Sequence, residues 1–221
     1  MARTPVVVGW SGGKDSALAL WSLRQSADYE IRALLTTVTT GFDRISMHGV
    51  RRQLLRSQAD ALALPLVEVP IPPECVNETY ERRMQEALRD ELIADVELVA
   101  FGDLFLEDVR AYREERLASG GKRGLFPIWG RDTADLAREF VAAGFGAILC
   151  CVDPRALDPS FAGRAYDEKL LADLPPAVDP CGENGEFHTF VHRGPIFGEP
   201  VDCRVGETVE RDGFVFADIL P

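Results

Sequence analysis

The first half of the chain alternates short apolar runs with longer segments whose apolar residues recur at helical spacing. The runs, rich in valine, leucine and isoleucine, predict strands at 6–9, 31–38, 66–69 and 98–101. The periodic segments predict helices that end near residue 26 or span 49–62, 77–94 (with Asn77 as N-cap) and 107–118. This alternation predicts an α/β fold, in which a parallel sheet with right-handed crossovers carries helices on both faces.

The second half of the chain is less regular and predicts a smaller α+β part. Its helical segments are expected at 132–143, with Asp132 as the N-cap, and at 166–174. Its strands are expected at 125–129, 147–152, 188–191, 201–205 and 213–219. The breaker at Gly120-Gly121 places the expected boundary between residues 1–122 and 123–221.

Composition narrows the class of protein. The 221 residues are 46% hydrophobic and 27% charged, as in a globular chain that buries a core. The net charge of −12 argues against a broad nucleic-acid or anionic-membrane surface, and no apolar run reaches 18 residues. We therefore expect a cytoplasmic protein with neither nucleic acid nor membrane as its partner.

The cysteines and histidines do not predict a zinc site or a disulfide framework. The five cysteines form no CxxC pair and lie at positions 75, 150, 151, 181 and 203. His188 and His192 are four apart in a segment expected to be a strand, where that spacing is about 13 Å. His48 precedes a predicted helix, either as a surface residue or within reach of the strand at 31–38.

A glycine-rich turn with one lysine follows the first strand and predicts an anion site. Glycines allow backbone N–H groups to approach a phosphate, the helix N-terminus adds partial positive charge, and lysine adds a full one. The turn differs from a Walker A loop because Val8 and Asp15 occupy two of its required positions. An ordinary βα turn is the competing interpretation. The expected nucleotide-binding residues are Ser11, Gly12, Gly13, Lys14, Asp15 and Ser16.

Ligands of open parallel sheets bind at the carboxyl ends of the strands. The predicted strands at 6–9, 31–38 and 98–101 could therefore converge on one nucleotide. Thr36 and Thr37 could present backbone groups to an adenine edge. Asp15 and Asp103 are candidate Mg²⁺ ligands, since Mg²⁺ prefers carboxylate and phosphate oxygens. The alternatives are a helix N-cap for Asp15 and a solvated turn carboxylate for Asp103.

A second polar stretch, residues 179–189, gathers acids, an amide, a thiol and an imidazole in a glycine-rich turn. Such a loop could bind ammonia or an amine, orient a carboxyl substrate, or act as a general base. Asn-Gly and glutamate-rich turns are also ordinary hairpin material. The candidate substrate-side residues are Cys181, Glu183, Asn184, Glu186 and His188.

Four segments together carry a resemblance to a known family. They are Ser-Gly-Gly-Lys-Asp-Ser (11–16), Leu-Pro-Leu (64–66), Phe-Pro-Ile-Trp-Gly-Arg-Asp-Thr (126–133) and Asp-Pro-Cys-Gly-Glu-Asn-Gly-Glu-Phe-His-Thr (179–189). Over nearly its whole length the chain resembles the diphthine–ammonia ligase family of PP-loop ATP pyrophosphatases. The first segment is typical of the superfamily, and the last is typical of the family.

The resemblance implies a five-stranded adenine-nucleotide α-hydrolase-like (HUP) domain, a smaller C-terminal domain, and ATP with Mg²⁺ as cofactors. It implies that an acceptor carboxylate, on a protein or a small molecule, is adenylated with release of pyrophosphate. Ammonia then displaces AMP and leaves an amide. By position it assigns catalytic roles to Lys14, Asp103, Glu183 and Glu186. A homodimer is compatible with it.

The chain departs from the family where an acceptor is expected to bind. The family's last motif reads Cys-Gly-Glu-x-Gly-Glu-Tyr/Phe-Glu-Thr, and His188 stands in place of its final glutamate. Residues 102–108 also differ. Diphthine is a modified histidine of elongation factor 2 in archaea and eukaryotes, and a bacterial relative would lack that target. Two other functions stay open: a PP-loop thiolase or tRNA-modifying enzyme, and a nucleotide sensor without turnover.

Overall fold

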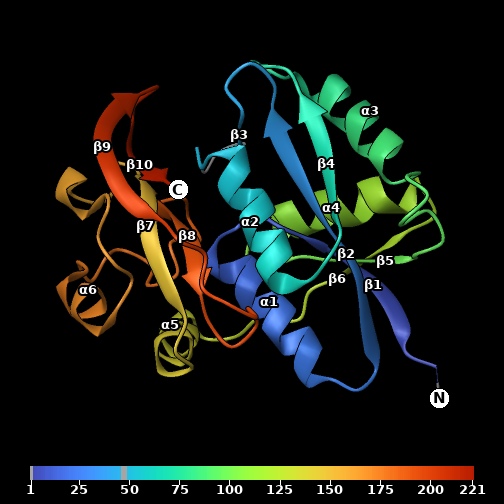
Figure 1. The fold of residues 1–221 in the computed structure, drawn as a ribbon, viewed down its shortest axis with the longest axis horizontal. Helices are drawn as coiled ribbons and strands as arrows, with labels where there is room; N and C mark the ends of the chain where they lie inside the picture. The colour runs from blue at the N-terminus through green and yellow to red at the C-terminus, as the bar shows by residue number, and fades with distance from the viewer. Residues whose placement is uncertain (1, 46–48) are drawn as a thin grey trace.

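The computed structural model describes residues 2–45 and 49–221, which form two sheets and the helices around them (Figure 1). His48 lies outside the described residues. The first part contains β1 (Thr4–Gly9), α1 (Lys14–Gln25), β2 (Tyr29–Thr39), β3 (Arg44–Ile45), α2 (Arg52–Leu62), β4 (Leu66–Ile71), α3 (Asn77–Ala87), β5 (Leu98–Ala100), α4 (Glu107–Ala118) and β6 (Arg123–Leu125). The second contains α5 (Thr133–Ala142), β7 (Gly146–Val152), a 3₁₀ turn η1 (Pro159–Phe161), α6 (Glu168–Asp173), β8 (Phe187–Arg193), β9 (Arg204–Arg211) and β10 (Phe214–Leu220).

The first sheet confirms the predicted arrangement of five parallel strands, in the order β4-β2-β1-β5-β6. The short strand β3, which the sequence pattern did not predict, pairs antiparallel with the end of β2. From β1 the chain builds outward through β2 and β4, and then crosses to β5 and β6 on the other side. The order therefore reverses between β1 and β5, and ligands of open α/β sheets bind at such a point.

Helices cover both faces of this sheet because its strands are apolar on both sides. Val6 and Val8 pack with α1 and α2, whereas Val7 points to the opposite core with Val99 and Leu117. Continuous apolar runs of this kind are typical of parallel sheets that are buried on both faces.

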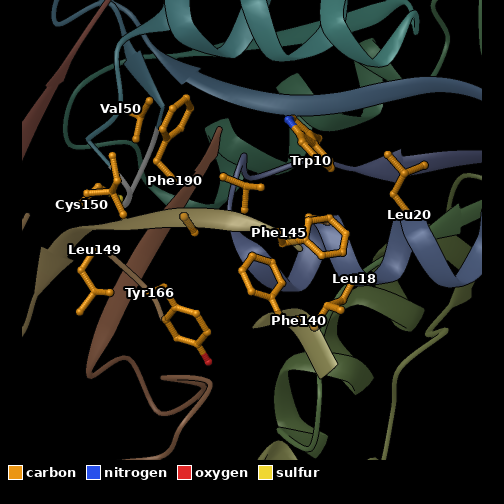
Figure 2. Close-up of a cluster of buried hydrophobic side chains, with 14 of the residues drawn as sticks. Trp10, Leu18, Leu20, Val50, Phe140, Phe145, Leu149, Cys150, Tyr166 and Phe190 are labelled. Carbon is orange, nitrogen blue, oxygen red and sulfur yellow. The ribbon is translucent and has the colours of Figure 1, made fainter. Parts of the chain in front are cut away.

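The second sheet is antiparallel, in the order β8-β7-β10-β9, and shares the core of α1 and α2. Figure 2 shows Phe140 and Phe145 of the second part beside Leu18 of α1. The Phe140 and Phe145 rings stack with centroids 4.7 Å apart. One hydrophobic core thus joins the two sheets.

Several predicted boundaries are corrected by the structure. Asn77 is the first residue of α3 rather than its cap, and the helix ends at Ala87. Beyond it, the Asp90 side chain accepts a hydrogen bond from the Leu92 N–H (3.0 Å), and such local bonds compete with helix continuation. The helix capped by Asp132 is confirmed, since its carboxylate accepts from the Asp135 N–H.

Two predicted strands are shifted because long-range pairing, rather than local pattern, selects the paired residues. The strand expected at 125–129 is β6, which pairs in parallel with β5 and so belongs to the first sheet. Residues 126–129 form a turn instead, closed by the Trp129 N–H on the Phe126 carbonyl. The strand expected at 201–205 begins at Arg204, where pairing with β10 starts.

Gln58 of α2 fastens the turn after β1 to strand β8. The side chain is completely buried. Its Nε2 donates to the carbonyls of Gly12 (3.0 Å) and Val191 (2.6 Å), and its Oε1 accepts from the indole N–H of Trp10 (3.0 Å). The Val191 N–H donates to the Gly12 carbonyl (2.9 Å), and the Lys14 N–H donates to the Thr189 hydroxyl (3.0 Å). The turn is therefore held against the second sheet.

We expect Gln58→Leu to destabilise the fold, because it removes a buried hydrogen-bond partner of the Trp10 N–H and the Val191 carbonyl. Leaving buried polar groups unpaired costs about 1–3 kcal/mol each, so the free energy of unfolding should fall by about 3 kcal/mol in urea titrations. The control is Gln53→Leu, an exposed position of the same helix, which should change stability by less than about 0.5 kcal/mol. Equal losses in both variants would contradict the role given to Gln58.

Candidate functional site

The turn after β1 is shaped as an anion cradle by its own short contacts. Gly12 has φ +76°, and Gly13 caps α1 through its backbone alone. The Ser11 hydroxyl accepts from the Gly13 N–H (3.2 Å) and lies 3.2 Å from the Ser16 hydroxyl, which donates to the Gly13 carbonyl (2.9 Å). Asp15 lies inside the first turn of α1, so its alternative role as an N-cap is wrong. The N-terminus of α1 faces the cavity that lies between the two sheets.

The turn after β5 approaches this cradle so closely that only glycine fits. A Cβ on Gly102 would lie 2.5 Å from the carbonyl carbon and oxygen of Asp15. The two turns follow β1 and β5, the strands between which the strand order reverses. The expected meeting of the 11–16 turn with Asp103 is therefore built into the backbone.

Lys14 carries the charge of the cradle. Its side chain is 3% exposed, and its Nζ lies 2.6 Å from an Asp15 carboxylate oxygen and 5.8 Å from the centre of the Phe187 ring. Burial lowers the pKa of Lys14, but Asp15, Cys181 and Glu183 together outweigh it and the net shift is upward. Lys14 is therefore a fixed ammonium ion.

A cavity of about 650 Å³ opens over these turns, between the two sheets. Nine of the residues predicted as site residues line it, namely Ser11, Lys14, Asp15, Ser16, Thr36, Thr37, Asp103, Glu183 and His188. Five do not: Gly12, Gly13, Cys181, Asn184 and Glu186. The structure adds lining residues that sequence reasoning missed, among them Tyr80, Phe101 and Arg113. No short motif marks these three, because they come from separate elements.

Thr36 and Thr37 lie where one edge of β2 has no neighbouring strand. On that edge β1 pairs with β2 as far as Leu35, and β3 begins pairing at Val38. Within the described residues, the edge between these two pairings faces the cavity. A ligand in the cavity can therefore reach the backbone of Thr36 and Thr37.

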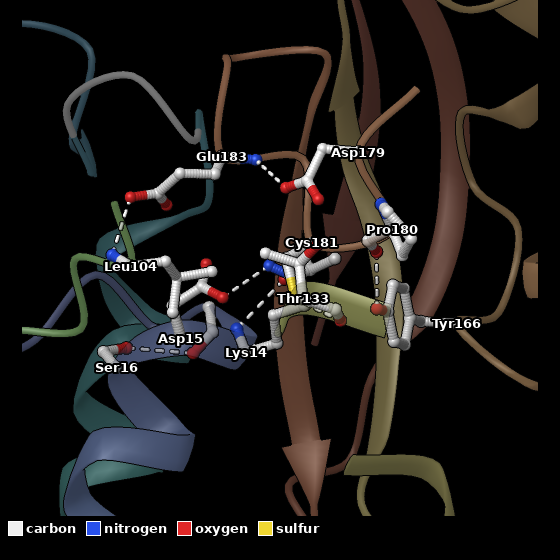
Figure 3. Close-up of polar contacts among 12 residues, drawn as sticks. Lys14, Asp15, Ser16, Leu104, Thr133, Tyr166, Asp179, Pro180, Cys181 and Glu183 are labelled. Atoms are coloured by element: carbon white, nitrogen blue, oxygen red, sulfur yellow. Dashed lines mark hydrogen bonds and ion pairs between the residues drawn. The ribbon is translucent and has the colours of Figure 1, made fainter. Parts of the chain in front are cut away.

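Glu183 reaches across the cavity from the second part to the first (Figure 3). Its carboxylate accepts from the Leu104 N–H (2.8 Å), beside Asp103. Burial raises the pKa of Glu183 to about 7, with smaller contributions from the Asp15 and Asp103 carboxylates, against the lowering effect of the Leu104 N–H and Lys14. Near neutral pH this carboxyl can therefore take up or release a proton.

The neighbouring acids hold the loop that carries Glu183. Glu186 is buried, and its Oε1 accepts from the Asp179 N–H and the Asn184 side chain, each at 3.0 Å. Asp179 in turn accepts from the Glu183 N–H (2.9 Å). The loop is also fixed by the Tyr166 hydroxyl, which donates to the Pro180 carbonyl (2.7 Å). These contacts orient Glu183 toward the cavity.

Cys181 and His188 differ in their contacts and in the direction of their pKa shifts. The Cys181 thiol donates to the Thr133 carbonyl (3.3 Å), and burial raises its pKa to about 12, which keeps it protonated. His188 lines the cavity, and burial together with Lys14 lowers its pKa to about 4. At neutral pH His188 is therefore an uncharged hydrogen-bonding group.

The two candidate magnesium ligands each face the cavity and already have a cationic partner. Asp15 pairs with Lys14, and Asp103 pairs with Arg113 (2.7 Å). Within residues 2–45 and 49–221, no three His, Cys, Asp or Glu side chains form a metal cluster. Two carboxylates beside a phosphate cradle still fit Mg²⁺, which binds through one or two carboxylates and substrate phosphates.

We expect Gly102→Ala to weaken nucleotide binding, because its Cβ would push the β5 turn away from Asp15. The affinity for a non-hydrolysable ATP analogue, measured by calorimetry, should fall at least about tenfold, or about 1.4 kcal/mol. Gly198→Ala is the matched control, since the nearest atom to its Cβ would be at 3.4 Å. Unchanged affinity in Gly102→Ala would contradict the close approach as a requirement of the site.

Comparison with known proteins assigns the family. The diphthamide synthase N-terminal domain matches residues 4–125, and the diphthamide synthase C-terminal domain matches residues 132–216. The diphthine–ammonia ligases of Bos taurus and Homo sapiens are each 27% identical over 95% of this chain and 86% of their own length. The ligase of Schizosaccharomyces pombe is 26% identical over 90% of this chain, which spans only 36% of that relative. No helix among the described residues is long and apolar enough to cross a membrane.

With both domains matched in order, the chain belongs to the diphthamide synthase family.

Proposed function

We propose that this protein is an ATP-dependent, amide-forming ligase that adenylates an acceptor carboxylate. One observation carries the proposal: a phosphate-sized cradle with the buried Lys14 and the titratable Glu183 line the same cavity. Relatives named diphthine–ammonia ligase support it. In this proposal the first part, up to the end of β6 at Leu125, binds ATP, and the second part completes the substrate side.

The nucleotide would lie along the carboxyl ends of β1 and β2. The 11–16 turn and the N-terminus of α1 would bind the β- and γ-phosphates, with Lys14 as their counter-ion. The free edge of β2 at Thr36 and Thr37 would contact the adenine. The α-phosphate would then lie toward Asp103 and Glu183, which both line the cavity and are brought near each other by the hydrogen bond between Glu183 and Leu104.

The proposed reaction has two steps. An oxygen of the acceptor carboxylate attacks the α-phosphorus, the bond from that phosphorus to the bridging oxygen breaks, and pyrophosphate leaves on the cradle. The nitrogen of ammonia then attacks the acyl carbon, and AMP leaves with the former carboxylate oxygen. Lys14 stabilises charge on the leaving pyrophosphate. Glu183 accepts a proton from the attacking ammonia.

The remaining predicted residues have supporting roles in this proposal. Glu186 and Asn184 orient the loop of Glu183 through their hydrogen bonds. His188 offers a neutral contact to the acceptor. Asp15 and Asp103 would hold Mg²⁺, which would neutralise phosphate charge.

The two alternative functions have less support. A sulfur-transferring enzyme is expected to carry a reactive CxxC pair, which this sequence lacks, and burial raises the pKa of Cys181 in the loop of Glu183. A sensor that binds ATP without turnover has no need for a carboxyl poised near neutral pH in its cleft. Product analysis separates the sensor from the ligase.

We expect the protein to convert ATP to AMP and pyrophosphate in the presence of ammonium and a suitable carboxylic acid, and Lys14→Ala to lose this activity. Loss of the leaving-group counter-ion should lower kcat/KM by about 10²–10³. Chromatography of the nucleotides identifies AMP as the product and measures the rate of each variant. Lys169→Ala, which changes an exposed lysine, is the control. Release of ADP and orthophosphate would contradict the proposal.

We expect the amide-forming step to speed up as the pH rises through about 7, because Glu183 acts as a base only when deprotonated and its pKa is raised to about 7. The profile should be measured at a constant concentration of unprotonated ammonia. Glu183→Gln should lose this rise of the rate with pH while keeping its affinity for ATP within about twofold. If Glu183→Gln retains the same profile, another group is the base.

A further inference from the structure

A second cavity, of about 350 Å³, lies beneath α3 and α4 and opens into the nucleotide cleft. Six residues line both cavities, namely Leu35, Tyr80, Met84, Phe101, Tyr112 and Arg113. Deeper in, its walls are aliphatic and come from Leu88, Val99 and Leu117. It is therefore an apolar side chamber of the proposed active site.

The chamber exists because α3 covers the sheet without filling the space. No residue of α3 is fully buried, although Tyr80 and Met84 pack partly against the core below. Polar contacts between α3 and α4 line its outer side, where Arg116 pairs with Glu81 (3.1 Å) and Gln85 donates to Ser119 (3.0 Å). These contacts hold the two helices together over the chamber.

The junction of the two cavities carries the guanidinium group of Arg113, beside the Asp103 carboxylate. Among the described residues that line the nucleotide cleft, Lys14 and Arg113 carry the positive charges, and Lys14 is assigned to phosphate. Arg113 stacks on the Phe101 ring, 4.3 Å from its centre, and its Nε lies 2.7 Å from Asp103. A carboxylate at Arg113 would lie between the apolar chamber and the cleft.

We propose that this chamber is the acceptor subsite, and that it takes the apolar body of a small carboxylic acid whose carboxylate is held at Arg113. This inference rests on the proposed ligase function and names its substrate class. It favours a small amphipathic acid over a carboxyl group on the surface of a folded protein, because the chamber lies behind the cleft, beneath two helices.

The test is the binding of straight-chain acids from acetate to octanoate by calorimetry, with a non-hydrolysable ATP analogue present. Burial of each methylene should tighten binding about fourfold. Leu88→Phe fills the chamber and should abolish this dependence on chain length, and Leu117→Phe is a second filling variant if the first does not fold. Leu92→Phe, at an exposed position just beyond α3, should retain it.

Arg113 is tested with a matched pair of ligands. Arg113→Gln should weaken octanoate at least about tenfold and leave 1-octanol unchanged. Three results would overturn the inference. The first is an affinity for the acids that does not depend on chain length, and the second is a dependence on chain length that persists equally in Leu88→Phe and Leu117→Phe. The third is that these two variants lose as much affinity for the ATP analogue as for octanoate, which would assign the chamber to adenine. None of these bears on whether the protein cleaves ATP to AMP and pyrophosphate, so failure of the inference and of the proposed function are distinguishable.

Discussion

The docking of strand β8 onto the phosphate turn is the contact on which the rest of the site depends. A glycine-rich turn has many accessible conformations, and this one is fixed by the Val191 N–H and the buried Gln58 amide on the Gly12 carbonyl. Hydrogen bonds buried in a low-dielectric core are costly to break. The shape of the nucleotide half is thereby tied to the second sheet.

The same docking sets the chemistry of the opposite wall. It brings the loop at 179–186 over the cradle, where backbone N–H groups link three acids in series, from Glu186 through Asp179 to Glu183. Two of these carboxylates serve the loop itself, and the third spans the cavity to Leu104. Partial burial then raises the pKa of Glu183 to about 7, so this carboxyl can take up or release a proton near neutral pH.

Much of the fold and part of the candidate site could be predicted from the sequence, because their signals are local. Helix α4 begins and ends at the predicted residues, and Asp132 caps α5 as expected. The 11–16 turn after β1 could also be predicted, because its glycines, its lysine and the start of α1 lie within a few residues of one another. By contrast, β3 has only two residues and forms because β2 is there to pair with it.

The sequence by itself determined the order of the strands and helices apart from β3, the glycine-rich turn with its lysine, and the family resemblance, all of which rest on neighbouring residues. Only the tertiary structure decided which acids face the cavity: Glu183 lines it, and Glu186, three residues later, is buried in its own loop. It also decided that Arg113 lines the cavity and that the chamber under α3 adjoins it. These outcomes depend on packing between residues far apart in the chain, which no local pattern encodes.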